Sequence, residues 1–450
     1  MPLAVRASSI ESSESGGIAR RLSLLPAAFL LVIAATTILS ASAGATETSA
    51  VSRIWTEPQS GYGFIGAAIN GAHSSIELSM YEVSDPAIEQ YLVSKARAGV
   101  DVRVILNAAY DGTTENATAV AVLRAGSVHV EWAPANQIFH AKYLVVDDAT
   151  AYIGTGNFVP SDYSSTRDFW VADTQGADVS AIVATFDGDF DHGGSASHQS
   201  GGLVWSPGST AALTGLISSA RHTLLVENEE MDSAPVEDSL IAAARRGVVV
   251  EIVMTQDSQW TAALDRLAAA GVHVRVLGQS QIYIHAKVIC ADCTGSTGIV
   301  FIGSENFSTS SLAYNRELGV ITTTPAAVET VRDFVDEDYA VGTAVKATFT
   351  TTTPVVANGG VTITSLVASI PPGGYESLNA HSAKANDSCW LSVTLPSGYS
   401  SEASGLGHAT ANAAGDVSWS WRIGTSTDPG TATAIVTCTA GTSTRRFTIT

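Results

Sequence analysis

The chain has 450 residues, of which 23 are Lys or Arg and 43 are Asp or Glu, so its formal net charge is −20 at pH 7. A chain of this length can bury several hydrophobic cores, and about three domains of ordinary size are expected. Proteins that hold nucleic acid in a groove need clustered basic residues, so the acidic composition argues against that class. The alternative is that the charge serves only solubility and surrounds a local basic pocket.

The first 45 residues have the features of a secretory leader. Arg20 and Arg21 precede an apolar run at 22–39, and small residues with an Ala-x-Ala pattern follow it. This order predicts a signal peptide at 1–45 and therefore a secreted, extracellular protein. The alternative is an uncleaved anchor, because the apolar run is close to the shortest length that spans a membrane.

Two later stretches of the chain predict the same succession of helices and strands, with Pro or Gly marking several helix ends. The first stretch contains a helix at 61–72, a strand at 75–81, a helix at 86–99, a strand at 100–106, a helix ending at 126 and a strand at 128–132. The second contains a helix at 210–220, a strand at 223–227, a helix at 235–247, a strand at 248–254, a helix ending at 271 and a strand at 272–277. Such a repeat predicts two lobes of one design.

Further helices at 178–189 and 325–339 are expected to close the two halves, with a linker at 193–202 between them. Alternating strands and helices predict the α/β class, here two pseudo-symmetric lobes at 46–197 and 198–345, each a mixed sheet flanked by helices.

From residue 346 the chain is rich in Thr, Ser and Gly, which predicts an immunoglobulin-like, all-β sandwich at 346–450. In this region Trp390, Trp419 and Trp421 are expected in the core, with an exposed binding face as the alternative. Such a domain would hold the protein at a lipid or cell-wall surface, or act only as a folding partner.

The tripeptide His-Ala-Lys occurs twice in a chain that has only ten His and five Lys. Each copy is followed by three polar groups at matching places: an Asp, an Asn in a Gly-x-x-Asn-Phe stretch, and a carboxylate eleven residues after that Asn. Two copies of one constellation predict a single site built from two halves. The first set is His140, Lys142, Asp147, Asn157 and Asp168, and the second is His285, Lys287, Asp292, Asn306 and Glu317.

The motif segments 138–146 and 282–289 are apolar and rich enough in β-branched residues to predict buried strands. Because side chains alternate along a strand, each motif His and Lys would face the same side. Asp147 stands an odd number of residues from its motif His and would face away, so a structural role is expected for it. Asp168 and Glu317 are better candidates to accept a hydrogen bond from an imidazole and fix its tautomer.

These motifs resemble the phospholipase D superfamily, whose signature is His-x-Lys-x4-Asp followed by a Gly-Ser-x-Asn stretch. The resemblance covers roughly residues 50–340 and implies two phospholipase D-like lobes with a phosphohistidine mechanism that needs no metal ion or other cofactor. It also implies that His140 is the nucleophile and His285 the general acid. The four phosphate ligands that it implies are Lys142, Lys287, Asn157 and Asn306. Thr155 replaces the usual Ser and Asp168 the usual Glu, but neither change removes a functional group.

The four Cys fit an oxidising compartment. Cys389 and Cys438 are expected to bridge two strands of the C-terminal region. Cys290 and Cys293 form a Cys-x-x-Cys beside the second motif, and a structural disulfide is preferred over a redox or metal site. The run that contains Asp187, Asp189, Asp191 and His192 resembles a metal site, but a solvated helix end is the preferred interpretation, so no metal ligands are assigned.

The sequence therefore predicts a secreted phosphodiesterase that hydrolyses phospholipids to phosphatidate and an alcohol, acting as a monomer with an internal pseudo-twofold axis. Phospholipid is the expected partner, and contact with a membrane surface is compatible with it. The alternatives are a secreted metal-independent endonuclease and a non-catalytic binding protein. Five aromatic residues near the motifs would line an apolar approach for acyl chains, with some of them in the core; they are Phe139, Phe158, Trp170, Tyr283 and Phe307.

Overall fold

The computed structural model describes residues 48–194, 196–278, 280–345, 360–401, 403, 405–424 and 427–450. The signal peptide predicted at 1–45 lies outside these residues. Within the described ranges, no helix has both the length and the apolar character needed to cross a membrane. The domain boundaries expected after residues 45, 197 and 345 stay predictions.

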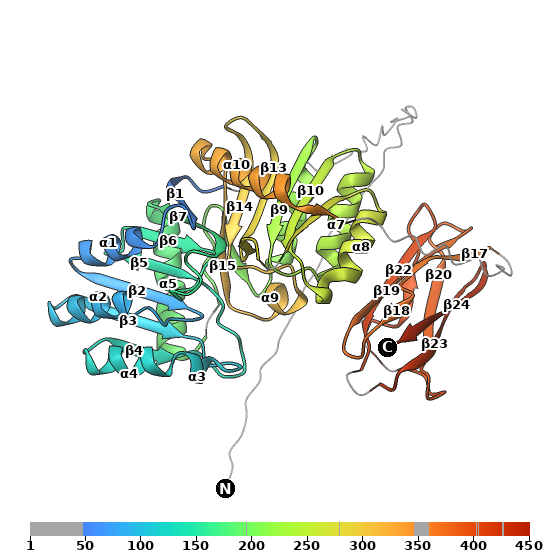
Figure 1. Ribbon diagram of the computed structural model, residues 1–450, viewed down its shortest axis with the longest axis horizontal. Coiled ribbons are helices and arrows are strands. Elements are labelled where there is room, and N and C mark those ends of the chain that lie inside the picture. The colour runs from blue at the N-terminus through green and yellow to red at the C-terminus, as the bar shows by residue number, and fades with distance from the viewer. Residues whose placement is uncertain are drawn as a thin grey trace, which may run out of the picture. The chain divides into compact units, whose positions relative to one another are not determined.

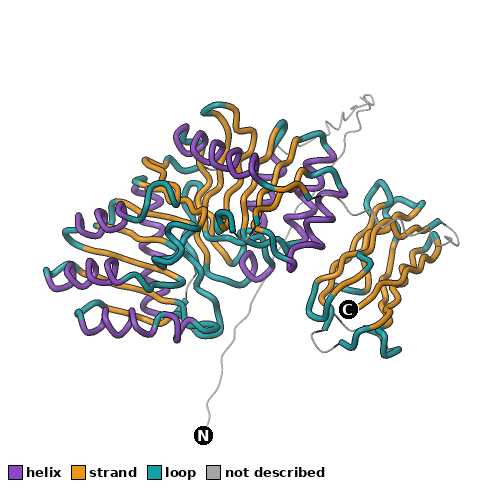
Figure 2. Tube along the Cα trace, viewed as in Figure 1, coloured by secondary structure: helices purple, strands orange, loops and turns teal. Residues whose placement is uncertain are grey.

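The first lobe is a mixed β-sheet covered by helices (Figure 1, Figure 2). Its strand order is β1-β7-β6-β5-β2-β3-β4, in which β2, β3 and β4 run parallel and the other pairs are antiparallel. The strands are β1 (Val51–Glu57), β2 (Ser75–Met80), β3 (Asp101–Leu106), β4 (His129–Trp132), β5 (Tyr143–Val146), β6 (Thr150–Gly154) and β7 (Thr166–Asp173). The helices are α1 (Gly63–Gly71), α2 (Pro86–Arg97), α3 (Gly112–Glu115), α4 (Ala117–Ala125) and α5 (Gly176–His192).

Local sequence signals explain the ends of α2 and the covering of the sheet. The Asp85 carboxylate accepts a hydrogen bond from the backbone N–H of Ala87 (2.8 Å), and Pro86 takes the first helical position. Gly99 follows the helix with φ +93, a conformation that glycine adopts at little cost. Apolar side chains of α1, α2 and α4 form one buried cluster with the sheet, and those of α5 belong to another cluster. Both faces of the sheet are therefore buried.

The second lobe repeats this design with the strand order β16-β11-β10-β9-β13-β14-β15-β8, so the predicted pair of pseudo-symmetric α/β lobes is confirmed. The sequence did not predict the edge strands β1 and β8, which precede the first helix of each lobe. The strands are β8 (Leu203–Ser206), β9 (Thr223–Asn228), β10 (Val249–Thr255), β11 (His273–Leu277), β13 (Lys287–Thr294), β14 (Thr297–Gly303), β15 (Glu317–Thr322) and β16 (Thr343–Ala344). The helices are α6 (Thr210–Ser219), α7 (Ala234–Arg245), the short η1 (Ser258–Trp260), α8 (Thr261–Ala269), α9 (Thr309–Ala313) and α10 (Pro325–Val341).

The expectation that the motif segments form unbroken strands is wrong at the motifs themselves. In the first lobe β5 begins only after the motif, and Phe139 makes an isolated bridge with Arg316 of the second lobe. In the second lobe β12 (Tyr283–Ile284) pairs with β7 of the first lobe, and β13 starts afresh at Lys287. The backbone N–H of His140 donates to the carbonyl of Arg316 (2.9 Å). Part of the motif backbone thus makes its hydrogen bonds across the lobe interface instead of within its own sheet.

Two buried ion pairs cross between the lobes. Arg167 on β7 pairs with Asp338 on α10 (Nε to Oδ2, 2.6 Å), and Arg316 pairs with Asp189 on α5 (Nη2 to Oδ1, 2.8 Å). No side chain of these pairs is more than 4% exposed. A hydrophobic cluster that contains residues of α5, α10 and both sheets surrounds them, so the lobes share one core. The interpretation of the α5 end as solvated is therefore wrong for Asp189, which is buried because it neutralises an arginine of the other lobe.

The C-terminal region forms a sandwich of two sheets, β17-β19-β22 and β18-β24-β23-β20-β21. Trp419 and Trp421 lie in its core, as expected, whereas Trp390 is 55% exposed and was wrongly expected inside. The strands are β17 (Val361–Leu366), β18 (Ser369–Ile370), β19 (Tyr375–Ser382), β20 (Ser388–Thr394), β21 (Gly407–Thr410), β22 (Asp416–Arg422), β23 (Gly430–Cys438) and β24 (Gly441–Ile449).

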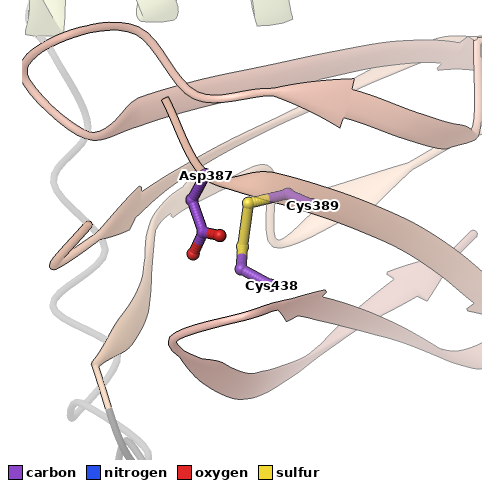
Figure 3. A group of neighbouring side chains, drawn as sticks. All are labelled: Asp387, Cys389 and Cys438. Atoms are coloured by element: carbon purple, nitrogen blue, oxygen red, sulfur yellow. A yellow bond between two sulfur atoms is a disulfide. The ribbon is translucent and has the colours of Figure 1, made fainter. Parts of the chain in front are cut away.

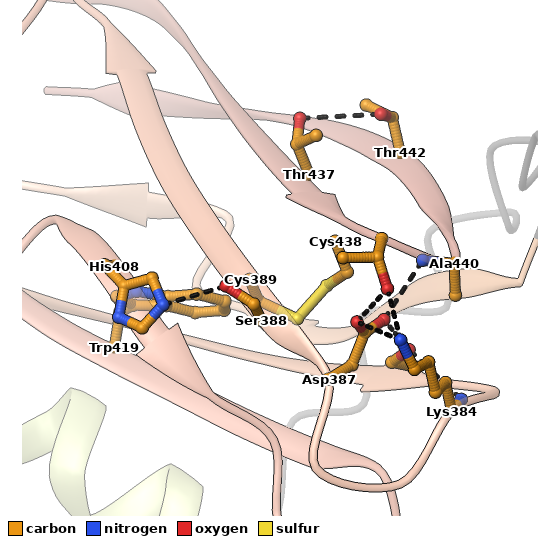
Figure 4. Close-up of a disulfide and its surroundings, with 12 residues drawn as sticks. Lys384, Asp387, Ser388, Cys389, His408, Trp419, Thr437, Cys438, Ala440 and Thr442 are labelled. Atoms are coloured by element: carbon orange, nitrogen blue, oxygen red, sulfur yellow. Dashed lines mark hydrogen bonds and ion pairs between the residues drawn. A yellow bond between two sulfur atoms is a disulfide. The ribbon is translucent and has the colours of Figure 1, made fainter.

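Both expected disulfides are present. Cys389 and Cys438 join neighbouring strands at directly paired positions (Figure 4). Asp387 lies beside this disulfide (Figure 3), and its carboxylate accepts hydrogen bonds from the hydroxyls of Ser382 (2.7 Å) and Thr439. Neither sulfur is a thiolate, so this trio offers no thiolate ligand to a metal ion. We assign it to the stability of the sandwich.

The second disulfide joins Cys290 and Cys293 inside β13. The strand continues to Thr294, and its pairing with β14 is irregular between Ala291 and Thr294. The disulfide spans this irregularity, which fits the preferred structural interpretation.

Candidate active site

A cavity of about 380 Å³ is lined by residues of both lobes. Four of the six predicted catalytic side chains line it, and each stands at the end of a strand. His140 precedes β5, Asn157 follows β6, His285 lies between β12 and β13, and Asn306 follows β14. The topology thus brings the two motif copies, 145 residues apart in their histidines, to one place.

The imidazole of His140 is oriented by two acceptors of the second lobe. Its Nδ1 lies 2.9 Å from Glu317 Oε2 and 3.2 Å from the carbonyl oxygen of Ser304. Because neither partner can donate, Nδ1 carries the hydrogen and the lone pair of Nε2 is left for chemistry. Burial lowers the pKa of His140, and the attraction of Glu317 offsets this only in part. The ring is therefore held in the neutral form that a nucleophile requires.

His285 is oriented by a carboxylate of the first lobe. Its Nδ1 lies 2.8 Å from Asp168 Oδ1, and its Nε2 lies 3.6 Å from Glu229 Oε2. Asp168 also accepts hydrogen bonds from the hydroxyls of Thr155 (2.5 Å) and Thr166 (2.9 Å). The unusual Thr155 therefore supplies the hydroxyl that a serine would supply.

Each imidazole thus takes its carboxylate partner from the opposite lobe, which the spacing of the motifs did not reveal. Burial by itself would raise the pKa of Asp168 and of Glu317, but the neighbouring imidazoles outweigh it and the pKa of both carboxyls is lowered. Both are therefore charged acceptors. Neither half of the site can orient its histidine alone.

Both motif lysines are fully buried. Each Nζ donates to the carbonyl of its own motif His: Lys142 to His140 at 2.8 Å, and Lys287 to His285. Burial, followed by repulsion from Lys287, lowers the pKa of Lys142 to about 7. Lys287 differs, because its Nζ also lies 2.9 Å from Glu229 Oε2.

The third motif residue of each set lies away from the cavity. The carboxylate of Asp147 accepts hydrogen bonds from the backbone N–H groups of His73, Ser74 and Ser75, which connect α1 to β2. The carboxylate of Asp292 likewise accepts hydrogen bonds from backbone N–H groups of the segment that connects α6 to β9. These aspartates hold the loop before a central strand, and no proton transfer at the histidines can involve them directly.

Several cavity residues lie outside the two motifs, and the sequence did not predict them. Glu229 and Glu230 directly follow β9, and Tyr81 directly follows β2 at the same place in the repeat. Burial raises the pKa of Glu230 to about 7. The carboxyl ends of parallel strands are where α/β folds collect ligand-binding residues, and laying the two halves side by side would have exposed these positions.

The aromatic residues expected to line an acyl approach are mostly core. Phe139, Phe158, Trp170 and Phe307 are fully buried, and only Tyr283 reaches the surface, at 37% exposure. The assignment failed because an aromatic residue in a strand beside a motif gives the same sequence pattern whether its side chain faces the cavity or the core. The aromatic rings that line the cavity belong to Tyr81 and Tyr110.

The fold and the site define a class: two α/β lobes that bring one histidine, one lysine and one asparagine each to a single position. The sequence model of the family described as "Cardiolipin synthase, PLD-like domain" matches residues 65–192 and 213–339. This chain belongs to that family and thus to the phospholipase D superfamily, as the motifs predicted. No match was found among curated proteins.

Solved structures with the same fold are only distantly similar in sequence. Polyphosphate kinase from Porphyromonas gingivalis has a TM-score of 0.54 and 18% identity; the match covers 66% of this chain and 48% of the kinase. The present chain thus spans about half of that enzyme. Phosphatidylserine synthase from Haemophilus influenzae has a TM-score of 0.54 and 12% identity over 67% of this chain and 90% of the synthase. At these identities the likeness concerns the fold.

Proposed function

We propose that this chain is a secreted phosphodiesterase that cleaves the distal phosphodiester of phospholipids, releasing phosphatidate and an alcohol. One observation carries the proposal: two histidines from different lobes line one cavity, and each is fixed by a buried carboxylate through Nδ1. This arrangement leaves both Nε2 atoms for chemistry. The proposal of secretion depends on the leader predicted at 1–45.

The arrangement suits in-line displacement at phosphorus. The Nε2 lone pair of His140 forms the bond to phosphorus while the bond from phosphorus to the alcohol oxygen breaks, and His285 gives its proton to that oxygen. Water then gives a proton back to His285 and attacks phosphorus, which breaks the bond to His140 and releases phosphatidate. A second alcohol in place of water would give transfer instead of hydrolysis.

The division of roles follows from what surrounds each ring. Burial favours neutral His140, and the edge-on ring of Tyr81 beside it, 4.9 Å between centroids, brings no formal charge. The Nε2 of His285 lies 3.6 Å from the Glu229 carboxylate instead. Unequal surroundings of this kind separate a nucleophile from an acid. We therefore assign attack to His140 and proton donation to His285.

Charge near the cavity favours a phospholipid over a nucleic acid. Glu229 and Glu230 line the cavity, and a polyanion would bring its neighbouring phosphates close to them. The net charge of −20 acts in the same direction. The matched family is also named for a lipid synthase.

The proposal is tested by assaying the purified protein, with EDTA present, on phosphatidylcholine vesicles and on single- and double-stranded DNA in parallel. We expect choline release without DNA cleavage, and no choline release from a His140→Ala variant. DNA cleavage without choline release would show instead a nuclease. Wild-type rates in His140→Ala would overturn the mechanism whatever the substrate.

A further inference from the structure

The two halves of the cavity differ at one equivalent position. Tyr81 follows β2 and Glu229 follows β9, each one residue beyond the end of a central strand. In the first lobe the ring of Tyr81 faces the motif, with Lys142 Nζ 5.3 Å from its centroid. In the second lobe a carboxylate takes the place of this ring.

The Glu229 carboxylate lies at the groups that the family resemblance implies as phosphate ligands of the second lobe. A single oxygen, Oε2, is 2.9 Å from Lys287 Nζ, 3.3 Å from Asn306 Nδ2 and 3.6 Å from His285 Nε2. The other oxygen accepts a hydrogen bond from the hydroxyl of Tyr283 (3.0 Å). Two donors, Lys287 and Asn306, converge on one anionic oxygen beside His285, which is the arrangement expected of an anion site.

Glu229 is ionised in this setting. Burial alone would raise its pKa, but Lys287 and then His285 outweigh it, so the pKa of Glu229 is lowered. Lys142 in the other half has the aromatic ring and a carbonyl as its near partners. Glu229 thus places a negative charge against the motif lysine of the second lobe, where the first lobe has the ring of Tyr81.

We propose that Glu229 is a specificity-determining residue: its carboxylate occupies the anion position of the second lobe and discriminates against ligands that bring a second negative charge to phosphorus. A monoanionic diester must compete with one carboxylate charge for Lys287 and Asn306. A phosphomonoester dianion, or a phosphate inside a polyanion, meets a stronger repulsion from the same carboxylate. The site would then select diesters whose leaving group is uncharged or cationic.

This inference rests on the proposed function only in taking Lys287 and Asn306 as phosphate ligands, so binding without turnover can test it. Inorganic phosphate, mainly a dianion at pH 8, and dimethyl phosphate, a monoanion, are titrated into the full chain by calorimetry. The variants are Glu229→Gln, which keeps a hydrogen-bond acceptor, and Glu131→Gln, which removes an equal charge from an exposed position on β4. Thermal unfolding checks that each variant is folded.

We expect Glu229→Gln to bind inorganic phosphate at least about tenfold more tightly than the wild type, which is the factor expected from one hydrogen bond to a charged group. The gain in affinity for dimethyl phosphate should be smaller. Glu131→Gln should match the wild type. Unchanged or weaker phosphate binding in Glu229→Gln, or an equal gain for both anions, overturns the inference. If Glu229→Gln does not fold, Glu229→Tyr, which copies the first lobe, is read by the same criteria.

The result is separable from the choice between lipid and nucleic acid. A protein that cleaves DNA and not phosphatidylcholine would still show the expected anion selectivity if Glu229 has this role. Conversely, if the wild type releases choline but Glu229→Gln shows unchanged anion selectivity, the proposed function stands and the proposed role of Glu229 is wrong. Absence of phosphate binding in every variant would overturn the inference together with the assignment of the phosphate ligands.

Discussion

The two lobes carry the same reactive groups in different electrostatic surroundings. Each supplies one His, one Lys and one Asn, but the first lobe places the neutral ring of Tyr81 against its motif and the second places the carboxylate of Glu229 there. The Asn stretches differ too. Gly156 leaves no room for a side chain, since a Cβ there would lie 2.2 Å from the Tyr62 hydroxyl, whereas the second lobe has Glu305 at the equivalent position.

This comparison teaches that a repeated motif does not give a repeated chemical role. The motif fixes which groups react, and the residues just outside it set the charge around each. Burial raises the pKa of Glu305 well above its usual range, so this acid adds no charge beside Glu317. The ionised carboxylate of Glu229 therefore accounts for much of the difference between the halves.

The largest expected difference between the lobes lies in covalent chemistry. We expect His140→Ala to lower turnover by at least about 10⁴-fold, because it removes the nucleophile. His285→Ala should also lower turnover strongly, but the phosphohistidine should still be able to form with a substrate whose leaving group needs no protonation. Mass spectrometry of an alkaline-quenched reaction locates the phosphate. A label on His285 in the wild type would reverse our assignment.

A smaller effect is expected from the carboxylates that cross between lobes. Glu317→Gln and Asp168→Asn leave the histidines in place but remove the charge at Nδ1, and we expect kcat to fall by about 10²- to 10⁴-fold in each. Loss of either carboxylate disfavours the protonated imidazole. If the two roles differ as proposed, the acidic limb of the pH profile of kcat should move to lower pH in Glu317→Gln, and the basic limb should do so in Asp168→Asn. Identical profiles would mean that the two histidines are interchangeable.

The interlobe ion pairs should affect stability more than chemistry. Arg167→Met and Arg316→Met each remove the arginine from a buried ion pair, which costs on the order of 3–5 kcal/mol. Chemical denaturation measures this loss. The double variant Arg167→Met with Asp338→Leu should recover part of it, because no charge is then left unpaired. If adding Asp338→Leu restores none of the lost stability, another interaction governs this position.

A pH effect is expected from Lys142 of the first lobe. Lys142 loses its proton as the pH rises through about 7, so the affinity for dimethyl phosphate, whose charge is constant, should fall above that pH by up to about tenfold per unit. Lys142→Arg stays protonated and should flatten the fall. The free energy of unfolding changes in the opposite direction. Between about pH 7 and pH 10.5 the unfolded chain binds more protons at Lys142 than the folded chain does, so the destabilising effect of Lys142 becomes smaller as the pH rises.

The smallest effect is expected from the third motif residues. Asp147→Ala and Asp292→Ala remove acceptors for backbone N–H groups of a connecting loop, and each should cost about 1 kcal/mol of stability. Similar losses are expected in both variants because the contacts repeat. Turnover at a temperature where both are folded should stay near that of the wild type. A loss of turnover without a loss of stability would give these aspartates a direct role.

The sequence by itself determined the two-lobe α/β fold, the β-rich C-terminal region and the set of groups that meet at the site. These follow from local signals: periodicity, Pro and Gly at helix ends, and a motif present twice. The crossed partners of His140 and His285, the breaks in the motif strands and the position of Glu229 were decided only by the tertiary structure. They depend on how one lobe packs against the other, and spacing along the chain carries no record of which lobe supplies a buried partner.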